Sequence, residues 1–315
     1  MRALLLTAVL FIASPARAQG CEHDDALSRA ASELLLAGGG WTSREVIDAA
    51  HAAGSDAPTV HALFRADGDA SEWLARLGSE VRCGRAESER GTLWLAAPSL
   101  GHLEVVSEDP LRVRASFAVG TGAATLFVLD ARGETAAFEV PGSPTELDLG
   151  RDLALPATLQ LVAAHADGPR PVAERTLGGV RAASGLAEGE PVLGAIESLR
   201  RGVESLPLRT SRLLAHIADA HAEAVCRSGR VAHELEAGDA EERLEAAGVR
   251  ARHVGEVVAR GRDRGAAWQA LTTSPSHHGA LTDARFTDVG IGEATDDEGR
   301  SCLVVVLAAW PRRFR

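Results

Sequence analysis

The stretch that decides the fold is Leu206–Cys226, which reads LPLRTSRLLAHIADAHAEAVC. Its inner positions recur at i, i+3, i+4, i+7 and i+11, at Leu214, Ile217, Ala218, His221 and Val225. This spacing is the period of an amphipathic helix, because 3.6 residues complete each turn. We therefore expect a helix here whose buried face includes His221.

The chain after this helix is rich in His and Glu and alternates between helical and extended patterns. His233 follows in GRVAH, and RLEAAG, residues 243–248, predicts a helix that ends on glycine. Glu256 stands among apolar neighbours in VGEVV, and SPSHH, residues 274–278, follows a helical stretch, Ala266–Leu271. The sequence FTDVGIGE, residues 286–293, then begins a hairpin whose last strand is Cys302–Leu307.

In their order, these elements resemble the CAP superfamily of cysteine-rich secretory, antigen 5 and pathogenesis-related proteins, in its bacterial SCP-like extracellular form. The resemblance covers residues 192–315 and rests on His221, His233, Arg243 with Gly248, Gly255-Glu256, Ser274-Pro275-Ser276-His277 and Gly290-Ile291-Gly292. The family's Gly-Glu-Asn element ends on Val257 here, and Ala280 stands where an Asn is usual. Because this chain contains no Asn at all, a compositional bias accounts for both departures.

The resemblance implies an α-β-α sandwich with a cleft lined by His233, Glu256 and His277, with His221 and Glu234 as nearby candidates. Two imidazoles and a carboxylate can hold a divalent metal such as zinc and leave one position for water. The same groups can work as a general acid and base without metal. His233, Glu256 and His277 are thus candidate catalytic residues and candidate metal ligands.

Three functions remain open from the sequence. The first is the binding of a ligand, namely a small molecule, a lipid or a cell-envelope component, or of a divalent metal in the cleft. The second is a cell-envelope hydrolase that uses Glu256 with His233 and His277, and the third is a structural module with a vestigial cleft. A serine hydrolase is disfavoured, because Ser274 and Ser276 lack a G-x-S-x-G element and Ser-Pro before a helix is ordinary capping. At His278, where the family usually has Arg, we expect a solvated side chain.

The composition narrows the class of partner. Of 315 residues, 44 are acidic and 33 are basic, and the formal charge is −11. This balance argues against a general nucleic-acid binder and against a polybasic membrane-surface protein. A hydrophobic content of 45% is enough for real cores.

The first residues predict export. Arg2, an apolar run through Ile12 and the sequence Ala16-Arg17-Ala18 have the form of a signal peptide cleaved near Ala18. We expect a secreted or periplasmic protein with no transmembrane segment, because no other stretch is long and apolar enough to cross a bilayer. The alternative is a lipoprotein anchored at Cys21.

Four cysteines, Cys21, Cys83, Cys226 and Cys302, suggest two disulfides in an exported protein. Three connectivities are possible, and the clustering of the cysteines near the two ends of the chain favours Cys21–Cys83 with Cys226–Cys302. Their spacing does not match a zinc-thiolate site.

Together with the segments that precede the CAP-like region, the sequence predicts an α+β protein of several domains. Residues 19–99 predict a mainly helical domain, with helices over 25–36, 43–51 and 70–77 and an extended stretch at 92–95. Residues 100–177 predict a small antiparallel β-sandwich, because Leu111–Val119 alternates with period two and a hairpin joins 126–129 to 135–140. A spacer or adhesion role is the default for this segment. Residues 178–191 are expected to be a linker.

Overall fold

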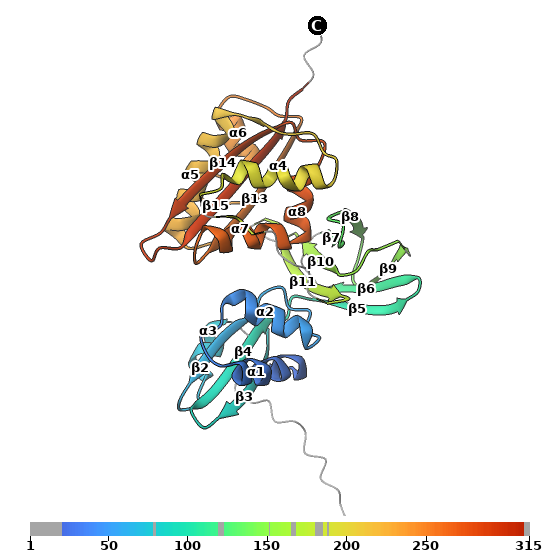
Figure 1. The fold of residues 1–315 in the computed structure, drawn as a ribbon, viewed down its shortest axis with the longest axis vertical. Coiled ribbons are helices and arrows are strands. Elements are labelled where there is room, and N and C mark those ends of the chain that lie inside the picture. The colour runs from blue at the N-terminus through green and yellow to red at the C-terminus, as the bar shows by residue number, and fades with distance from the viewer. Residues whose placement is uncertain are drawn as a thin grey trace, which may run out of the picture. The chain divides into compact units, whose positions relative to one another are not determined.

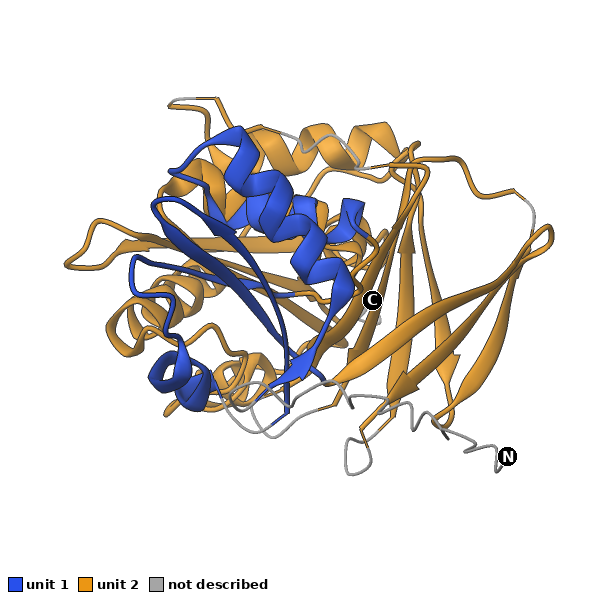
Figure 2. Cartoon of the chain, turned by 90° about the horizontal axis from the view of Figure 1, so that it is seen from below, with its two compact units in different colours: residues 1–53, 59–99 blue, residues 54–58, 100–315 orange. Residues whose placement is uncertain are grey.

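The computed structural model describes residues 21–77, 80–118, 123–150, 152–164, 168–179, 185–187 and 189–311. Eight helices and several sheets lie in this part of the chain, as expected for an α+β protein. The chain forms two compact units, one made of residues 1–53 and 59–99 and the other of residues 54–58 and 100–315 (Figure 2). The predicted signal peptide lies outside the described residues, and the predicted domain boundaries stay predictions.

The first unit is not mainly helical, contrary to the sequence prediction. Its helices are α1 (Asp25–Ala37), α2 (Ser43–Ala52) and α3 (Ser71–Leu77), and they accompany a sheet in the order β1-β3-β4-β2. The strands are β1 (Glu22–His23), β2 (His61–Arg65), β3 (Val81–Ser88) and β4 (Gly91–Pro98). The extended stretch predicted at 92–95 lies within β4, which is buried on both faces. The strand β2 is mostly exposed, so it lacks the alternation that reveals a half-buried strand.

The helix α1 packs directly on β3. A Cβ atom on Gly84 would lie 2.2 Å from the backbone nitrogen of Ser28, so only glycine permits this approach. The Cys21–Cys83 disulfide joins the residue directly before β1 to β3, the strand that pairs with β1 in parallel. This is the pairing that the sequence favoured.

Residues 100–177, which we call the β segment, form two antiparallel sheets in the second unit. One has the order β11-β10-β7-β8 and the other β5-β6-β9, and both contribute to one hydrophobic core. The strands are β5 (Gly101–Glu108), β6 (Leu111–Phe117), β7 (Ala124–Leu129), β8 (Thr135–Val140), β9 (Thr145–Gly150), β10 (Ala157–Ala163) and β11 (Arg170–Leu177). The predicted hairpin is β7–β8, whose turn is closed by the Asp130 carboxylate accepting the Arg132 and Glu134 N–H groups.

Residues 54–58 belong to this second unit although the chain around them belongs to the first. The Asp56 carboxylate, which is 2% exposed, accepts the Leu103 N–H at 2.9 Å and lies 2.5 Å from Nδ1 of His102. The Asp56 carbonyl accepts the Glu174 N–H at 2.7 Å. Asp56 therefore links β5 of one sheet to β11 of the other.

The C-terminal part of the second unit is built on a sheet of order β12-β14-β15-β13, of which Figure 1 labels β13, β14 and β15. Its strands are β12 (Arg209–Thr210), β13 (His253–Gly261), β14 (Asp288–Thr295) and β15 (Ser301–Ala309). One face packs in a hydrophobic cluster with α4 (Val192–Gly202), α7 (Arg264–Thr273) and α8 (Pro275–Thr282). The other packs with α5 (Arg212–Ser228) and α6 (Ala240–Ala246). Because both faces are covered, β15 is buried from Cys302 to Ala309.

The Gly-x-Gly element lets α5 lie against β14. A Cβ atom on Gly290 would lie 2.0 Å from the carbonyl carbon of Leu214, and one on Gly292 would lie 2.1 Å from that of Ala218. No larger side chain fits at either position without separating the helix from the sheet. The helix predicted over 206–226 is confirmed in its amphipathic part, and it begins at Arg212, where Ser211 is the N-cap residue.

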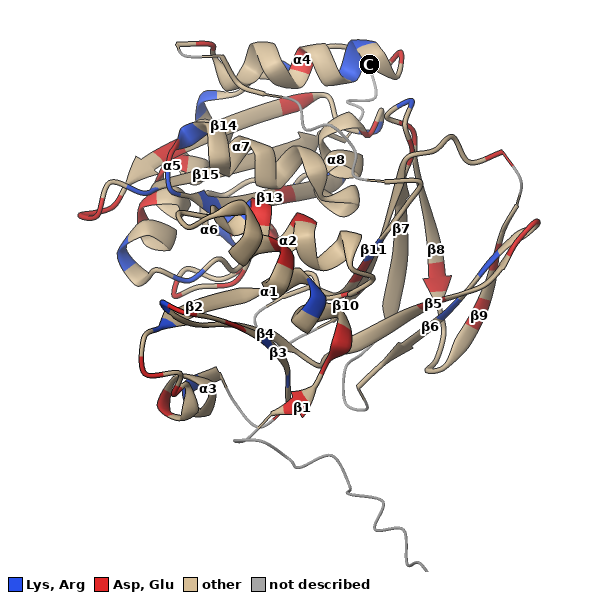
Figure 3. Cartoon of the chain, turned by 60° about the horizontal axis from the view of Figure 1, so that its bottom comes forward, with Lys and Arg blue, Asp and Glu red and all other residues tan. Residues whose placement is uncertain are grey.

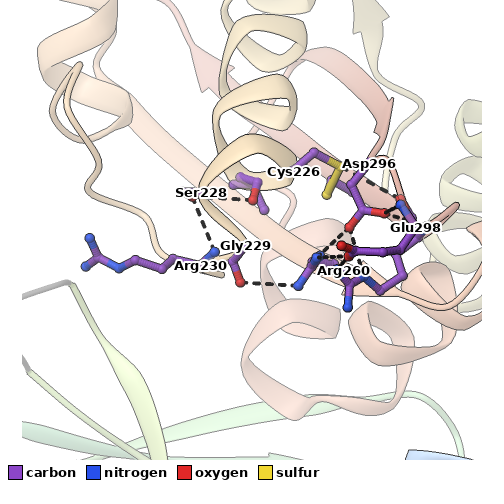
Figure 4. The surroundings of a disulfide bond; sticks show 10 residues. Cys226, Ser228, Gly229, Arg230, Arg260, Asp296 and Glu298 are labelled. Carbon is purple, nitrogen blue, oxygen red and sulfur yellow. Dashed lines mark hydrogen bonds and ion pairs between the residues drawn. A yellow bond between two sulfur atoms is a disulfide. The ribbon is translucent and has the colours of Figure 1, made fainter.

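The second disulfide, Cys226–Cys302, joins the end of α5 to the start of β15. Beside it, Asp296 accepts a hydrogen bond from Arg260 (Figure 4) and another from Arg300. Desolvation opposes ionisation there, but the hydrogen bonds from Arg260 and Arg300 prevail and lower the pKa of Asp296 to about 2.

Acidic residues and arginines are interspersed along the elements of both units (Figure 3). Within the described ranges, the helices are too short or too polar to cross a membrane.

Candidate functional site

The candidate site lies where α5, α6 and β13 meet. Along β13, Val254 and Val258 pack toward α5 and α6, whereas Val257 packs toward the opposite face. Because alternate residues of a strand point to opposite faces, Glu256 points toward α5 and α6. His221 is on α5, Arg243 is on α6, and His233 lies in the loop between these helices. We call these four residues and His277 the histidine site.

The Glu256 carboxylate is buried, with 3% of its side chain exposed, and both of its oxygens have partners. Oε1 lies 3.1 Å from Nδ1 of His233 and 3.7 Å from Nε2 of His221. Oε2 accepts a hydrogen bond from the Arg243 guanidinium. A buried carboxylate is tolerated when it is paired in this way. Glu256 is thus shielded from solvent and holds the side chains of His233 and Arg243 in place.

Arg243 is the centre of the hydrogen-bond network, with 7% of its side chain exposed. Besides Glu256, it bonds to the carbonyl of Gly238 at 2.7 Å, to the carbonyl of His233 at 3.3 Å and to Nδ1 of His221 at 3.0 Å. In the sequence, Arg243 stands out only as an element of the family resemblance, and no role in the site was expected of it. Its place among those elements is the one sequence signal that could have indicated it.

His221 is a buried histidine with both ring nitrogens occupied. Because the guanidinium only donates, Nδ1 accepts from Arg243, and Nε2 therefore carries the proton and donates to the Ala232 carbonyl at 3.0 Å. Burial lowers the pKa of His221, an effect that Glu256 opposes and Arg243 reinforces. His221 is therefore neutral, and it fixes the loop that carries His233.

His233 is the member of this group that reaches solvent, with 26% of its side chain exposed. Its Nδ1 donates to the Glu256 carboxylate at 3.1 Å. This bond fixes the tautomer, so Nε2 is left as an acceptor. No described residue forms a hydrogen bond with Nε2.

His277 lies in the first turn of α8. Burial lowers its pKa to about 4, and the nearby His233 lowers it as well. Its Nδ1 is buried, and no partner for it exists within the described ranges. His233 is hydrogen-bonded to Glu256. His277 lies near His233 but forms no bond with the Glu256 carboxylate.

The other candidate residues have different roles. Glu234 is exposed and forms no hydrogen bond or ion pair with the other described residues of the site. His278 is 2% exposed and lies with Nδ1 3.1 Å from the Thr272 carbonyl, so the expectation of a solvated side chain is wrong. Ser274 is the N-cap residue of α8, as expected, but its hydroxyl bonds to Gln160 of β10 and not to a backbone N–H of the helix.

The arrangement of the candidate metal ligands around Glu256 does not fit a divalent cation. The Glu256 oxygens are already engaged by Arg243 and His233, and the guanidinium charge opposes a second cation beside the same carboxylate. No cluster of three or more His, Cys, Asp and Glu side chains suited to a metal lies in the described part of the chain.

No family model matches this chain, and no curated protein matches it either. Among solved structures, it is similar to an outer surface protein from Borrelia burgdorferi, with 17% identity and a TM-score of 0.37, over 41% of this chain and 100% of that one. It is similar to an extracellular protein containing an SCP domain from Bacillus anthracis, with 13% identity and a TM-score of 0.31, over 77% and 93% of the two chains. It is also similar to a cysteine-rich secretory protein from Staphylococcus aureus, with 12% identity and a TM-score of 0.29, over 80% and 88%.

Proposed function

We propose that this chain is an exported CAP-like protein, with an α-β-α sandwich at its C-terminal end, that binds a polar, non-cationic ligand through His233 and His277. The observation that carries the proposal is the Glu256 carboxylate held between Arg243 and His233. This arrangement gives His233 one fixed tautomer and turns its Nε2 outward as an acceptor. The Nδ1 atom of His277 is another polar atom of the histidine site that lacks a partner within the described residues, as does the buried Nε atom of Arg243.

The charge of the site supports a ligand that is not a cation. Arg243 and Glu256 neutralise each other, and His221 and His277 are neutral because burial lowers their pKa. The ligand would therefore be held by hydrogen bonds, and a cell-envelope component rich in hydroxyl and amide groups has suitable chemistry.

A cell-envelope hydrolase is the second candidate, in a form that differs from the one first considered. Because Glu256 is buried behind His233, the acting base would be His233 at Nε2, with Glu256 as a positioning residue. The carboxylate would then hold the imidazolium that forms when His233 takes a proton.

The test uses purified peptidoglycan and the whole chain. Binding is measured by co-sedimentation, and turnover is measured by the release of soluble fragments. We expect His233→Gln and His277→Gln to weaken binding, while His216→Gln, which alters an exposed histidine of α5, leaves it unchanged. Equal binding by all three variants would contradict the proposal for this ligand class. Fragment release that depends on His233 would favour the hydrolase, and binding without release would favour a binding protein.

A further inference from the structure

A buried amide of the β segment holds the start of the helix that carries His277. Gln160 of β10 is 2% exposed. Its Oε1 accepts from the hydroxyls of Ser274 at 2.9 Å and Ser276 at 2.7 Å, and from the Ser276 N–H at 3.3 Å. Its Nε2 donates to Oε2 of Glu174 at 2.7 Å. The backbone N–H on one side and the carboxylate on the other fix the orientation of the amide.

This bond network anchors one end of α8, and a second buried side chain anchors the other. Arg200, which is 1% exposed, donates to the carbonyls of Leu281 and Asp283 at the C-terminal end of α8. Gln160 acts at the N-terminal end, on the residue directly before His277. The position of the His277 ring therefore depends on a side chain from outside the CAP-like region.

A second and independent contact reaches His233. Gly168, in the connection between β10 and β11, has a φ of +97°. A Cβ atom there would lie 3.2 Å from Cβ of His233 and 3.6 Å from its ring atom Cδ2. Backbone of the β segment therefore lies directly against the second histidine of the site.

We propose that the β segment is one wall of the histidine site, and that Gln160 is a positioning residue that holds α8 and with it His277. We propose this role for the β segment in place of the spacer or adhesion role expected from the sequence. The proposal rests on the proposed function only in that it treats His233 and His277 as the ligand-binding groups. A ligand that enters the site is expected to meet atoms of both the β segment and the CAP-like region.

The test is the rate at which diethyl pyrocarbonate modifies each histidine of the whole chain, followed by mass spectrometry. At pH 7.5 His277, whose pKa is about 4, is neutral both when it is buried and when it is exposed, so the rate reports access alone. His216, exposed on α5, is the internal reference. We expect His277 to react much more slowly than His216.

Gln160→Leu removes the acceptor shared by the two serines, and leaving a buried polar group unsatisfied favours local opening. We expect the His277 rate to rise by about tenfold, with His216 unchanged. Ser276→Ala should give a smaller rise, Ser276→Thr should restore protection, and Ser198→Ala on the exposed face of α4 should have no effect. If Gln160→Leu does not fold, the three serine variants decide the matter.

Two results would overturn the inference. One is an unchanged His277 rate in Gln160→Leu and Ser276→Ala. The other is a rise at all buried histidines together with a lower melting temperature, since that would be general destabilisation. A chain that protects His277 in this way but binds no peptidoglycan would refute the proposed ligand and leave the role of Gln160 standing.

Discussion

The buried ion pair between Arg243 and Glu256 leads to a prediction about the free energy of unfolding. Arg243→Met keeps most of the side-chain volume and removes the charge. It leaves the Glu256 carboxylate, 3% exposed, without its cationic partner. Breaking a buried ion pair from one side costs about 3–5 kcal/mol, because the remaining charge has lost its compensation. For a unit of this size, that cost corresponds to a fall in melting temperature of roughly 6–20 °C.

A double variant also removes the Glu256 charge that Arg243→Met leaves unpaired. In Arg243→Met with Glu256→Leu, no buried charge remains, and replacing both members of such a pair is often nearly neutral. We therefore expect the double variant to be more stable than Arg243→Met alone. His233 should at the same time lose its fixed tautomer, which ¹⁵N chemical shifts of the imidazole report.

The assay is urea unfolding of the four proteins of this double-mutant cycle, followed by a probe in the second unit such as the fluorescence of Trp268. A loss of less than about 1 kcal/mol in Arg243→Met would refute the reasoning, since exposed ion pairs have that value. Strictly additive effects of the two substitutions would also refute it.

Three other predictions concern the packing of α5 on Gly290, the protonation of His277 and the binding of zinc. Gly290→Ala should destabilise the second unit by about 1–3 kcal/mol in urea unfolding, because the added Cβ would meet α5 at 2.0 Å, whereas Gly194→Ala, with open space around it, should not. The folded chain keeps His277 neutral down to a pH of about 4, so between pH 6.5 and 4 the unfolded chain binds more protons. Stability should therefore fall by up to about 3 kcal/mol as the pH is lowered through that window, and His277→Phe should flatten the slope. Zinc titration should leave the melting temperature unchanged; a rise that His233→Ala abolishes would show a metal site.

Much of the fold could be predicted because local patterns agree with it. Strands that alternate, such as Leu111–Phe117, and helices with polar caps, such as α2 with the Thr42–Glu45 capping box, are visible in sequence. The error in residues 19–99 has a physical cause. The strand β2 is short and mostly exposed, so it has no period-two signal although it pairs with β4, where only residues 92–95 were predicted to be extended.

The site was predicted only in part, because it depends on contacts between distant residues. The family resemblance indicated His233 and Glu256, and these two side chains are in contact. Arg243 had no role assigned, since nothing local shows that a helical arginine turns inward to a carboxylate on β13. Gln160 gave no signal at all, because its partners Ser274 and Ser276 lie more than a hundred residues away.

The insertion of residues 54–58 into the second unit bears on how this protein can be divided. A fragment that begins at residue 100 contains the β segment and the histidine site but lacks Asp56. The Leu103 and Glu174 N–H groups would then lose their acceptors, and the two sheets would lose the residue that joins them. A shortened chain would therefore be an altered protein, and failure of such a fragment to bind a ligand would say nothing about the intact one. Only point variants in the whole chain separate the contribution of one part from that of another.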